Sequence, residues 1–305
     1  MNRLIRYWNQ NRFKIIIIII IIVFAILLIR FIDYIVSIMP EENNIAQNNL
    51  TNYVGPTESV LTGEEMTKNQ MQMVSTIYQF VDYCNAQNIE EAYNLLSQEC
   101  KEELYTNIDI FTNNYVTPIF NNQNKIAAIE NWGGNTYKVQ IKDNPLTTGI
   151  NNTQDVFEDY ITIVIDDNGE NKLNINNYIG REEINKVGSI ENIEITVLRS
   201  DTYMDYQTYT FKVVNNSTNE ILLDDKVNMD SLYIVDQNNL KLSAYTHEIS
   251  TEELRIMPRE TREITIKYYN NYIYGDYIQS INFSRIILNY NKNEIINYGT
   301  VKIEL

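Results

Sequence analysis

One hydrophobic segment near the start of the chain constrains the molecule most. Fifteen consecutive apolar residues run from Ile15 to Ile29, and they include eight isoleucines in a row. At 1.5 Å per residue this run covers about 22 Å of helix, less than the ~30 Å hydrocarbon core of a bilayer. The chain stays largely apolar through Met39. The sequence therefore predicts one transmembrane helix over residues 15–39.

The flanks of this segment are typical of a retained anchor. Its predicted anchoring side chains at the membrane boundaries are Phe13, Lys14, Ile15, Ile29, Arg30 and Asp33. A cleaved secretory signal is the alternative, but residues 35–40, IVSIMP, lack the small-residue pattern that precedes cleavage. An uncleaved anchor is therefore favoured.

The charges on either side of the segment predict its orientation. Arg3, Arg6, Arg12 and Lys14 precede the span without an acidic residue. Positive flanks stay in the cytoplasm, which predicts a cytoplasmic N-terminus, a single pass through the cell membrane and an extracytoplasmic bulk. The whole chain has a net charge of −16, so nucleic acid is not an expected partner.

Composition and pattern divide the chain into five parts. They are a basic cytoplasmic tail (1–14), the transmembrane helix (15–39), a flexible linker (40–61), a helix-then-strand domain (62–186) and a strand-rich domain (189–305).

The first extracytoplasmic domain has helical periods followed by strand patterns. Apolar positions from Gln70 to Cys84 follow a helical period, a second helix begins at Asn88 and runs through Leu104, and a third is expected around 108–120. Strands at 137–141, 160–165 and 172–178 follow, and Asn168-Gly169 marks a hairpin turn. With the phrase NIEEAYNLLSQECKEEL, this order resembles the nuclear transport factor 2-like fold, an α+β cone of helices on a bent sheet.

The second domain is predicted to be all-β. Seven short strand patterns recur between Ile193 and Leu305, which favours a β-sandwich. The segments Phe211–Thr218 and Ile256–Ile266 resemble the strand and turn features of immunoglobulin-like domains in bacterial surface proteins. The expected fold is thus an N-terminal transmembrane helix, a nuclear transport factor 2-like cone and an immunoglobulin-like sandwich.

Catalytic and metal-binding signatures are not evident. His247 is the only histidine and is expected at the surface, and no zinc, P-loop or dinucleotide motif occurs. The sequence LLDDKVNMDS could offer oxygens of Asp224, Asp225, Asp230 and nearby Asn228 to calcium, but Lys226 among them favours a solvated acidic loop. No catalytic, cofactor or metal residue is assigned, and the chain is expected to be non-enzymatic.

The two cysteines are expected to be free. Cys84 and Cys100 lie on successive predicted helices, and an antiparallel hairpin would leave them about 12 Å out of register. A disulfide needs Cα atoms within about 7 Å, so two buried thiols are favoured over a bond.

A tyrosine-rich segment is the candidate contact surface. It comprises Tyr268, Tyr269, Tyr272 and Tyr274, with packing at a strand edge as the competing interpretation.

These features indicate an envelope protein that binds other proteins or itself, held to the lipid bilayer through one helix. The two domains behind one anchor resemble a bacterial (Firmicutes-type) single-pass membrane protein. A tail, one helix and such a cone also resemble the assembly subunits of bacterial conjugation and type IV secretion machines. That family implies a role in assembly, although the added sandwich and the single cone depart from its pattern. The alternatives are a sensor or binder of a small ligand or wall component and, third, an isomerase-like enzyme with carboxylates inside the cone.

Overall fold

The computed structural model describes residues 68–121, 123–144, 156–227, 231–290 and 295–305. The chain divides into two compact units, Met1–Tyr53 and Val54–Leu305, and every described residue belongs to the second. The predicted tail, membrane span, linker and anchoring residues Phe13, Lys14, Ile15, Ile29, Arg30 and Asp33 therefore lie outside the described residues.

Helices occupy about the first quarter of the described chain, and only the first of them is long. Helix α2 buries one apolar face that includes Ile77, Phe80 and Cys84, as its helical period predicts. The helical segments are α2 (Lys68–Asn85), α3 (Ile89–Asn94), α4 (Gln98–Glu103), α5 (Ile108–Phe111), the π-helical turn η1 (Thr112–Val116) and α6 (Thr117–Phe120).

The predicted second helix, from Asn88 through Leu104, is wrong as one element. It breaks between α3 and α4, where Leu96 forms a parallel bridge with Leu173 of a distant strand. The backbone N–H of Ser97 donates to the carbonyl of Leu173 at 3.0 Å, and the N–H of Leu173 donates to the carbonyl of Leu95 at 2.8 Å. Ser97 then caps α4 by accepting from the N–H of Cys100. Tertiary strand pairing overrides the helical pattern at this point.

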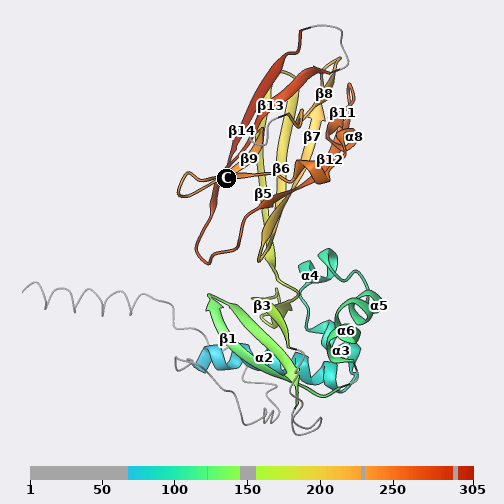
Figure 1. Cartoon of the computed structure of the whole chain (residues 1–305), viewed down its shortest axis with the longest axis vertical. Helices are drawn as coiled ribbons and strands as arrows, with labels where there is room; N and C mark the ends of the chain where they lie inside the picture. Colours follow the sequence, from blue (N-terminus) through green and yellow to red (C-terminus); the bar gives the residue numbers. More distant parts are fainter. Residues whose placement is uncertain (1–67, 122, 145–155, 228–230, 291–294) are drawn as a thin grey trace, which may run out of the picture. The chain divides into compact units, whose positions relative to one another are not determined.

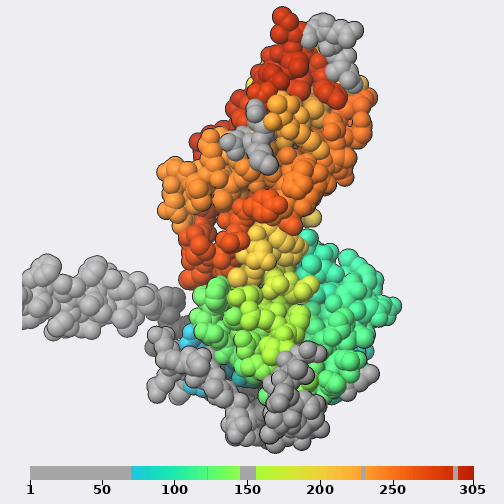
Figure 2. Space-filling model, viewed as in Figure 1, coloured from blue at the N-terminus to red at the C-terminus, as the bar shows by residue number. Residues whose placement is uncertain are grey.

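These helices pack with a four-stranded antiparallel sheet. Its strands, in spatial order, are β1 (Lys125–Gly133), β2 (Thr136–Asp143), β3 (Phe157–Ile165) and β4 (Asn171–Asn174). Helix α2 lies across the sheet in Figure 1, and Figure 2 shows the helical residues near 100 and the strand residues near 160 forming one continuous surface. Tyr137, Val139 and Ile161 of the sheet share one buried core with Phe80 and Phe111 of the helices. We call residues 68–174 the helix–sheet region.

The rest of the described chain forms two sheets around a second core. One sheet has four strands in the order β12-β7-β6-β5, and the other has the order β10-β9-β13-β8-β11 with β14 paired to β13. We call this part the two-sheet region. Its strands are β5 (Tyr178–Ile190), β6 (Ile193–Tyr203), β7 (Tyr206–Asn215), β8 (Glu220–Leu222), β9 (Leu232–Asp236), β10 (Lys241–Ser243), β11 (Arg255–Ile256), β12 (Thr261–Tyr269), β13 (Ile278–Tyr290) and β14 (Tyr298–Glu304), with the short helices η2 (Thr246–Glu248) and α8 (Thr251–Leu254) between β10 and β11.

Two close contacts fix the edges and turns of this region. A Cβ atom at Gly188 of β5 would lie 2.6 Å from Val301 Cγ1 and 2.7 Å from Ile303 Cγ1, so a residue without a side chain lets β5 approach β14. At the end of β7, the buried Asn215 donates through Nδ2 to the carbonyl of Asn219 at 2.8 Å and to that of Met257 at 2.9 Å. This side chain therefore joins the turn after β7 to the segment after β11.

The predicted fold class, an N-terminal transmembrane helix followed by an α+β nuclear transport factor 2-like cone and an immunoglobulin-like sandwich, is wrong. The described chain is mostly β, with 50% of residues in strands and 22% in helices. Among the described residues, no helix has the length and apolar character needed to cross a membrane. The prediction gave too much weight to helical periods in the first domain, where α3 to α6 are only four to six residues long. It also missed β1 and β5, and β5 runs across the boundary that we expected between residues 186 and 189.

Candidate functional site

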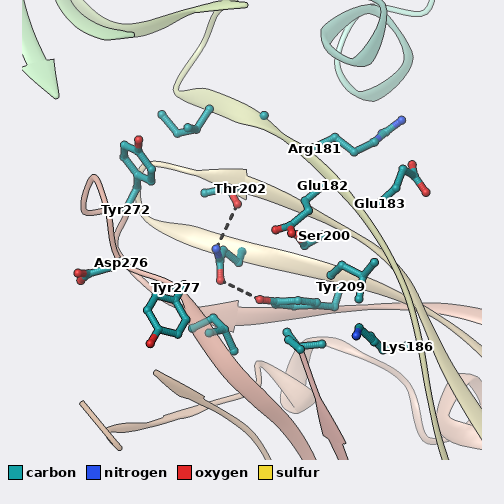
Figure 3. A pocket seen from close by; sticks show the side chains of 16 residues that line it. Arg181, Glu182, Glu183, Lys186, Ser200, Thr202, Tyr209, Tyr272, Asp276 and Tyr277 are labelled. Atoms are coloured by element: carbon teal, nitrogen blue, oxygen red, sulfur yellow. Dashed lines mark hydrogen bonds between the residues drawn. The ribbon is translucent and has the colours of Figure 1, made fainter. Parts of the chain in front are cut away.

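A groove of about 590 Å³ opens at one end of the two-sheet region. Its floor comes from β5, β6 and β7, and its far wall comes from residues 272–278 together with Leu305. Figure 3 shows Glu182 and Ser200 side by side in the floor, with Tyr272 and Tyr277 at the opposite end from Lys186. Chain segments separated by up to about 125 residues thus meet at one concave surface.

Strand register explains why this floor is polar. Glu182, Ser200 and Tyr209 lie in one row across β5, β6 and β7, and Gly180, Thr202 and Gln207 lie in the next. These rows continue the inward face of the sheet, which is apolar deeper in the region, where Val197 pairs with Phe211. Inward faces of packed sheets are normally apolar, so two polar rows are a departure that points to a binding surface.

A chain of hydrogen bonds fixes most of the polar floor. Tyr209 donates its hydroxyl to Gln207 Oε1 at 3.2 Å, and Gln207 Nε2 donates to Thr202 Oγ1 at 3.1 Å (Figure 3). Asn270 Nδ2 also donates to Gln207 Oε1, at 3.0 Å. Burial, with a smaller effect from the negative charge of Glu182, raises the pKa of Tyr209, which keeps its hydroxyl neutral and able to donate.

Ser200 differs from its neighbours in the floor. Its side chain is only 5% exposed and lines the groove, yet its hydroxyl makes no hydrogen bond to any residue that the structure describes. Ser200 Oγ is not among the fully buried unpaired polar atoms of the described residues, so it faces the open space of the groove. This hydroxyl is therefore available to a bound molecule.

The wall of the groove is held at both ends. The N–H of Tyr272 donates to the carbonyl of Met204 at 2.8 Å, and the N–H of Tyr277 donates to Gln237 Oε1 at 2.8 Å. Between them the chain turns through Gly275, whose φ of +88° is in the region that favours glycine. Because its ends are fixed, the segment presents Tyr277 at 62% exposure without a long mobile loop.

The structure divides the predicted tyrosine surface. Tyr268 is fully buried in the two-sheet core, so it is wrong as a contact residue. Tyr269 is 49% exposed and Tyr274 is 64% exposed, whereas Tyr272 is half-buried and lines the groove. Alternation along β12 accounts for the inward position of Tyr268, and the remaining tyrosines follow where the strand ends.

An ion-pair cluster connects the groove floor to helix α4. Arg181 of β5 donates to Asp201 at 2.8 Å, to Glu102 at 2.9 Å and to Glu103 at 3.2 Å. Asp201 also accepts from the hydroxyl of Tyr178 at 2.8 Å. Burial alone would lower the pKa of Arg181, but the hydrogen bond and charge of Asp201, with the other neighbouring groups, outweigh it and raise the pKa. Figure 3 shows the side chain of Arg181 pointing away from the polar floor.

The helix–sheet core holds a carboxylate that the sequence pattern did not single out. Asp159 of β3 is fully buried and accepts from the Tyr115 hydroxyl at 2.7 Å and from the N–H groups of Asn176 and Asn177 at 2.9 and 2.8 Å. Both asparagines have positive φ, so Asp159 holds a strained turn between β4 and β5. Its oxygens are thus committed to structural donors, and it does not line the groove.

The other candidate residues take separate positions. Cys84 and Cys100 are buried and free, as expected, although the single helix from which their register was predicted is broken into α3 and α4. His247 is exposed at the surface, as expected. The acidic loop is not simply solvated, because Asp224 is fully buried and Asp225 pairs with Arg285 at 2.8 Å.

Metal-ligating groups do not converge in the described part of the chain. No set of three His, Cys, Asp or Glu side chains there could hold a metal ion. Asn228 and Asp230 of the calcium hypothesis lie outside the described residues.

Comparison with known proteins identifies no similar protein. No family model, curated protein or solved structure matches the chain.

Proposed function

We propose that this chain is a non-enzymatic interaction protein of the bacterial cell envelope, which uses the groove between β5–β7 and residues 272–278 to bind a segment of another protein. One observation carries the proposal. The inward face of the sheet becomes polar where the groove opens, and the hydroxyl of Ser200, a residue that is only 5% exposed, has no partner there among the described residues.

The walls of the groove support binding of an extended chain. Tyrosine gives a large, rigid contact area at low entropic cost and also carries a hydroxyl for hydrogen bonding. Tyr272 and Tyr277 supply such surfaces at one end, and the polar rows offer donors and acceptors between them and Lys186. An extended segment rich in amide groups would pack on the tyrosine rings and form hydrogen bonds with the polar rows.

The proposed location rests on the sequence. The apolar segment 15–39 with its basic leader favours a chain held at the cell membrane and exposed on the extracytoplasmic side. Protease added to intact cells should then degrade the two-sheet region, whereas a chain that faces the cytoplasm would survive until the cells are lysed.

Photocrosslinking tests the proposed binding site. A photoreactive phenylalanine analogue placed at Tyr277 of the full-length chain should give a discrete protein adduct in cells. The matched control is the same analogue at Tyr298, which is 42% exposed. Tyr298 begins β14 and does not line the groove, whereas Leu305, just beyond the other end of this strand, does. Equal adducts from both positions, or none from either, would contradict a protein-binding groove.

A small ligand or wall component is the second candidate. Hydroxyl and amide groups of Ser200, Thr202 and Gln207 beside tyrosine rings also suit a polyhydroxylated molecule. In that case the position-277 adduct would carry glycan rather than protein, and digestion with a glycosidase instead of a protease would remove its mass.

A further inference from the structure

The charges that line the groove are not balanced. Glu182, Glu183 and Asp276 contribute carboxylates, while the cations are Lys186 and Arg181. Arg181 is committed to three acidic side chains on the other face of the sheet. Lys186 lies at the end of the groove away from the tyrosines in Figure 3. The three carboxylates therefore outnumber the one lining cation that is not committed to other acidic groups, Lys186, and the groove as a whole is negative.

Strand register brings one of these carboxylates to a hydroxyl that has no partner among the described residues. Glu182 lies directly opposite Ser200 in the β5–β6 pair, and the two side chains share the inward face. Glu182 is exposed and makes no ion pair with any described residue, and the Ser200 hydroxyl is also without a partner in that part of the chain. A carboxylate and a hydroxyl are both acceptors for a cationic donor, which can give them charge-assisted hydrogen bonds.

The tyrosine end suits the same type of group. A cation over a tyrosine ring is attracted by the ring quadrupole, and the aliphatic stem of lysine or arginine packs well on aromatic surfaces. The net charge of −16 would also steer a basic partner toward this chain over distances comparable to the Debye length.

We propose that the groove recognises a lysine or arginine side chain of an extracytoplasmic protein partner, with Glu182 and Ser200 accepting hydrogen bonds from its cationic head and the tyrosine end contacting its stem. This inference rests on the proposed function, because it names the chemical class of the segment that the groove binds.

A binding measurement with matched charge variants tests this inference. The probe is a fluorescein-labelled pentapeptide, Gly-Lys-Gly-Lys-Gly, and its binding to the full-length chain is followed by fluorescence anisotropy. Glu182→Gln should weaken binding about tenfold, as expected for loss of one charge-assisted contact, and Ser200→Ala about fivefold. Glu194→Gln is the control, because Glu194 is exposed on β6 away from the groove and its loss changes the net charge equally. It should weaken binding less than twofold.

The outcomes separate this inference from the proposed function. Equal weakening by Glu182→Gln and Glu194→Gln would show general attraction to an acidic protein and would overturn the inference. Binding of the lysine-acetylated peptide with unchanged affinity would overturn it as well, and so would absence of binding to the native chain. In each of these cases a protein adduct from position 277 would still support the groove as a binding site for a different kind of segment.

Discussion

Replacing Arg181 with methionine should destabilise the protein strongly, because it leaves a buried carboxylate without its main partner. The side chain of Asp201 is 3% exposed and lies 2.8 Å from Arg181 Nε. Removing one partner of a buried ion pair costs about 3–5 kcal/mol. Asp201 keeps a hydrogen bond from Tyr178 at 2.8 Å, and Arg199 lies 3.6 Å away, so we expect the low end, about 3 kcal/mol.

Thermal unfolding measures this loss. For a folded unit of about 150–250 residues, 1 kcal/mol shifts the melting temperature by about 2–4 °C, which gives a decrease of about 6–12 °C for Arg181→Met. Glu102→Gln removes another partner of the same arginine, but the Glu102 side chain is 52% exposed. An exposed pair contributes about 0–1 kcal/mol, so this control should shift the melting temperature by less than about 4 °C.

A double variant tests the physical reason. In Arg181→Met/Asp201→Asn the stranded charge is gone, so the double variant should be no less stable than Arg181→Met alone. Equal shifts for Arg181→Met and Glu102→Gln, or additive losses in the double variant, would refute the idea that a buried charge dominates this cluster.

Three further predictions follow from other contacts. Burial raises the pKa of Asp159, although its hydrogen bonds oppose the shift. The folded state therefore binds a proton on this carboxyl more tightly than the unfolded state does, and the contribution of Asp159 to stability falls as pH rises from about 4 through the raised pKa. Asp159→Asn should remove this pH dependence of stability in denaturant titrations at several pH values, and it should cost about 1–3 kcal/mol at neutral pH. A slope that survives would assign it to other groups. Asn215→Ala leaves the carbonyls of Asn219 and Met257 without the donor that Asn215 Nδ2 supplies. It should lower the free energy of unfolding in urea by about 2–4 kcal/mol. An unchanged urea midpoint would show that water replaces the amide. Burial raises the pKa of Cys100 to about 12 and also raises the pKa of Cys84. A thiol-specific disulfide reagent at pH 8 should therefore modify neither cysteine in the folded chain and both cysteines in denaturant. Fast labelling of the folded chain would contradict their burial.

Local patterns predicted the elements that depend on local chemistry. The helical period of α2 and the alternation of β6, β7 and β12 were visible because each element buries one face. The Asn168-Gly169 turn also formed, with the N–H of Gly169 donating to the carbonyl of Asp166 at 2.9 Å. In these segments the residue pattern and the tertiary environment agree.

Elements that depend on distant partners were missed. Strand β1 has two exposed apolar residues, Ile126 and Trp132, which obscure its alternation. Strand β5 shifts register between Tyr178 and Gly180 and again between Glu183 and Lys186, so no simple period of two runs along it. The helix break at Leu96 depends on Leu173, which lies far away in the sequence.

The groove could not be predicted for the same reason. Glu182, Ser200 and Tyr209 are ordinary residues in sequence, and only the register of β5, β6 and β7 places them in one row. The tyrosine segment was the one visible signal. It led to Tyr272 at the groove, but also to Tyr268, which the strand turns into the core.

Photocrosslinking from position 277, with and without a filled groove, tests the central claim most directly. Thr202→Trp places a large ring on the floor of the groove, while the crosslinking position on the opposite wall is unchanged. If the groove binds the partner, the protein adduct should fall at least fivefold in the Thr202→Trp chain while its melting temperature stays close to that of the native chain. An adduct of undiminished yield from a folded Thr202→Trp chain would show that the partner binds elsewhere.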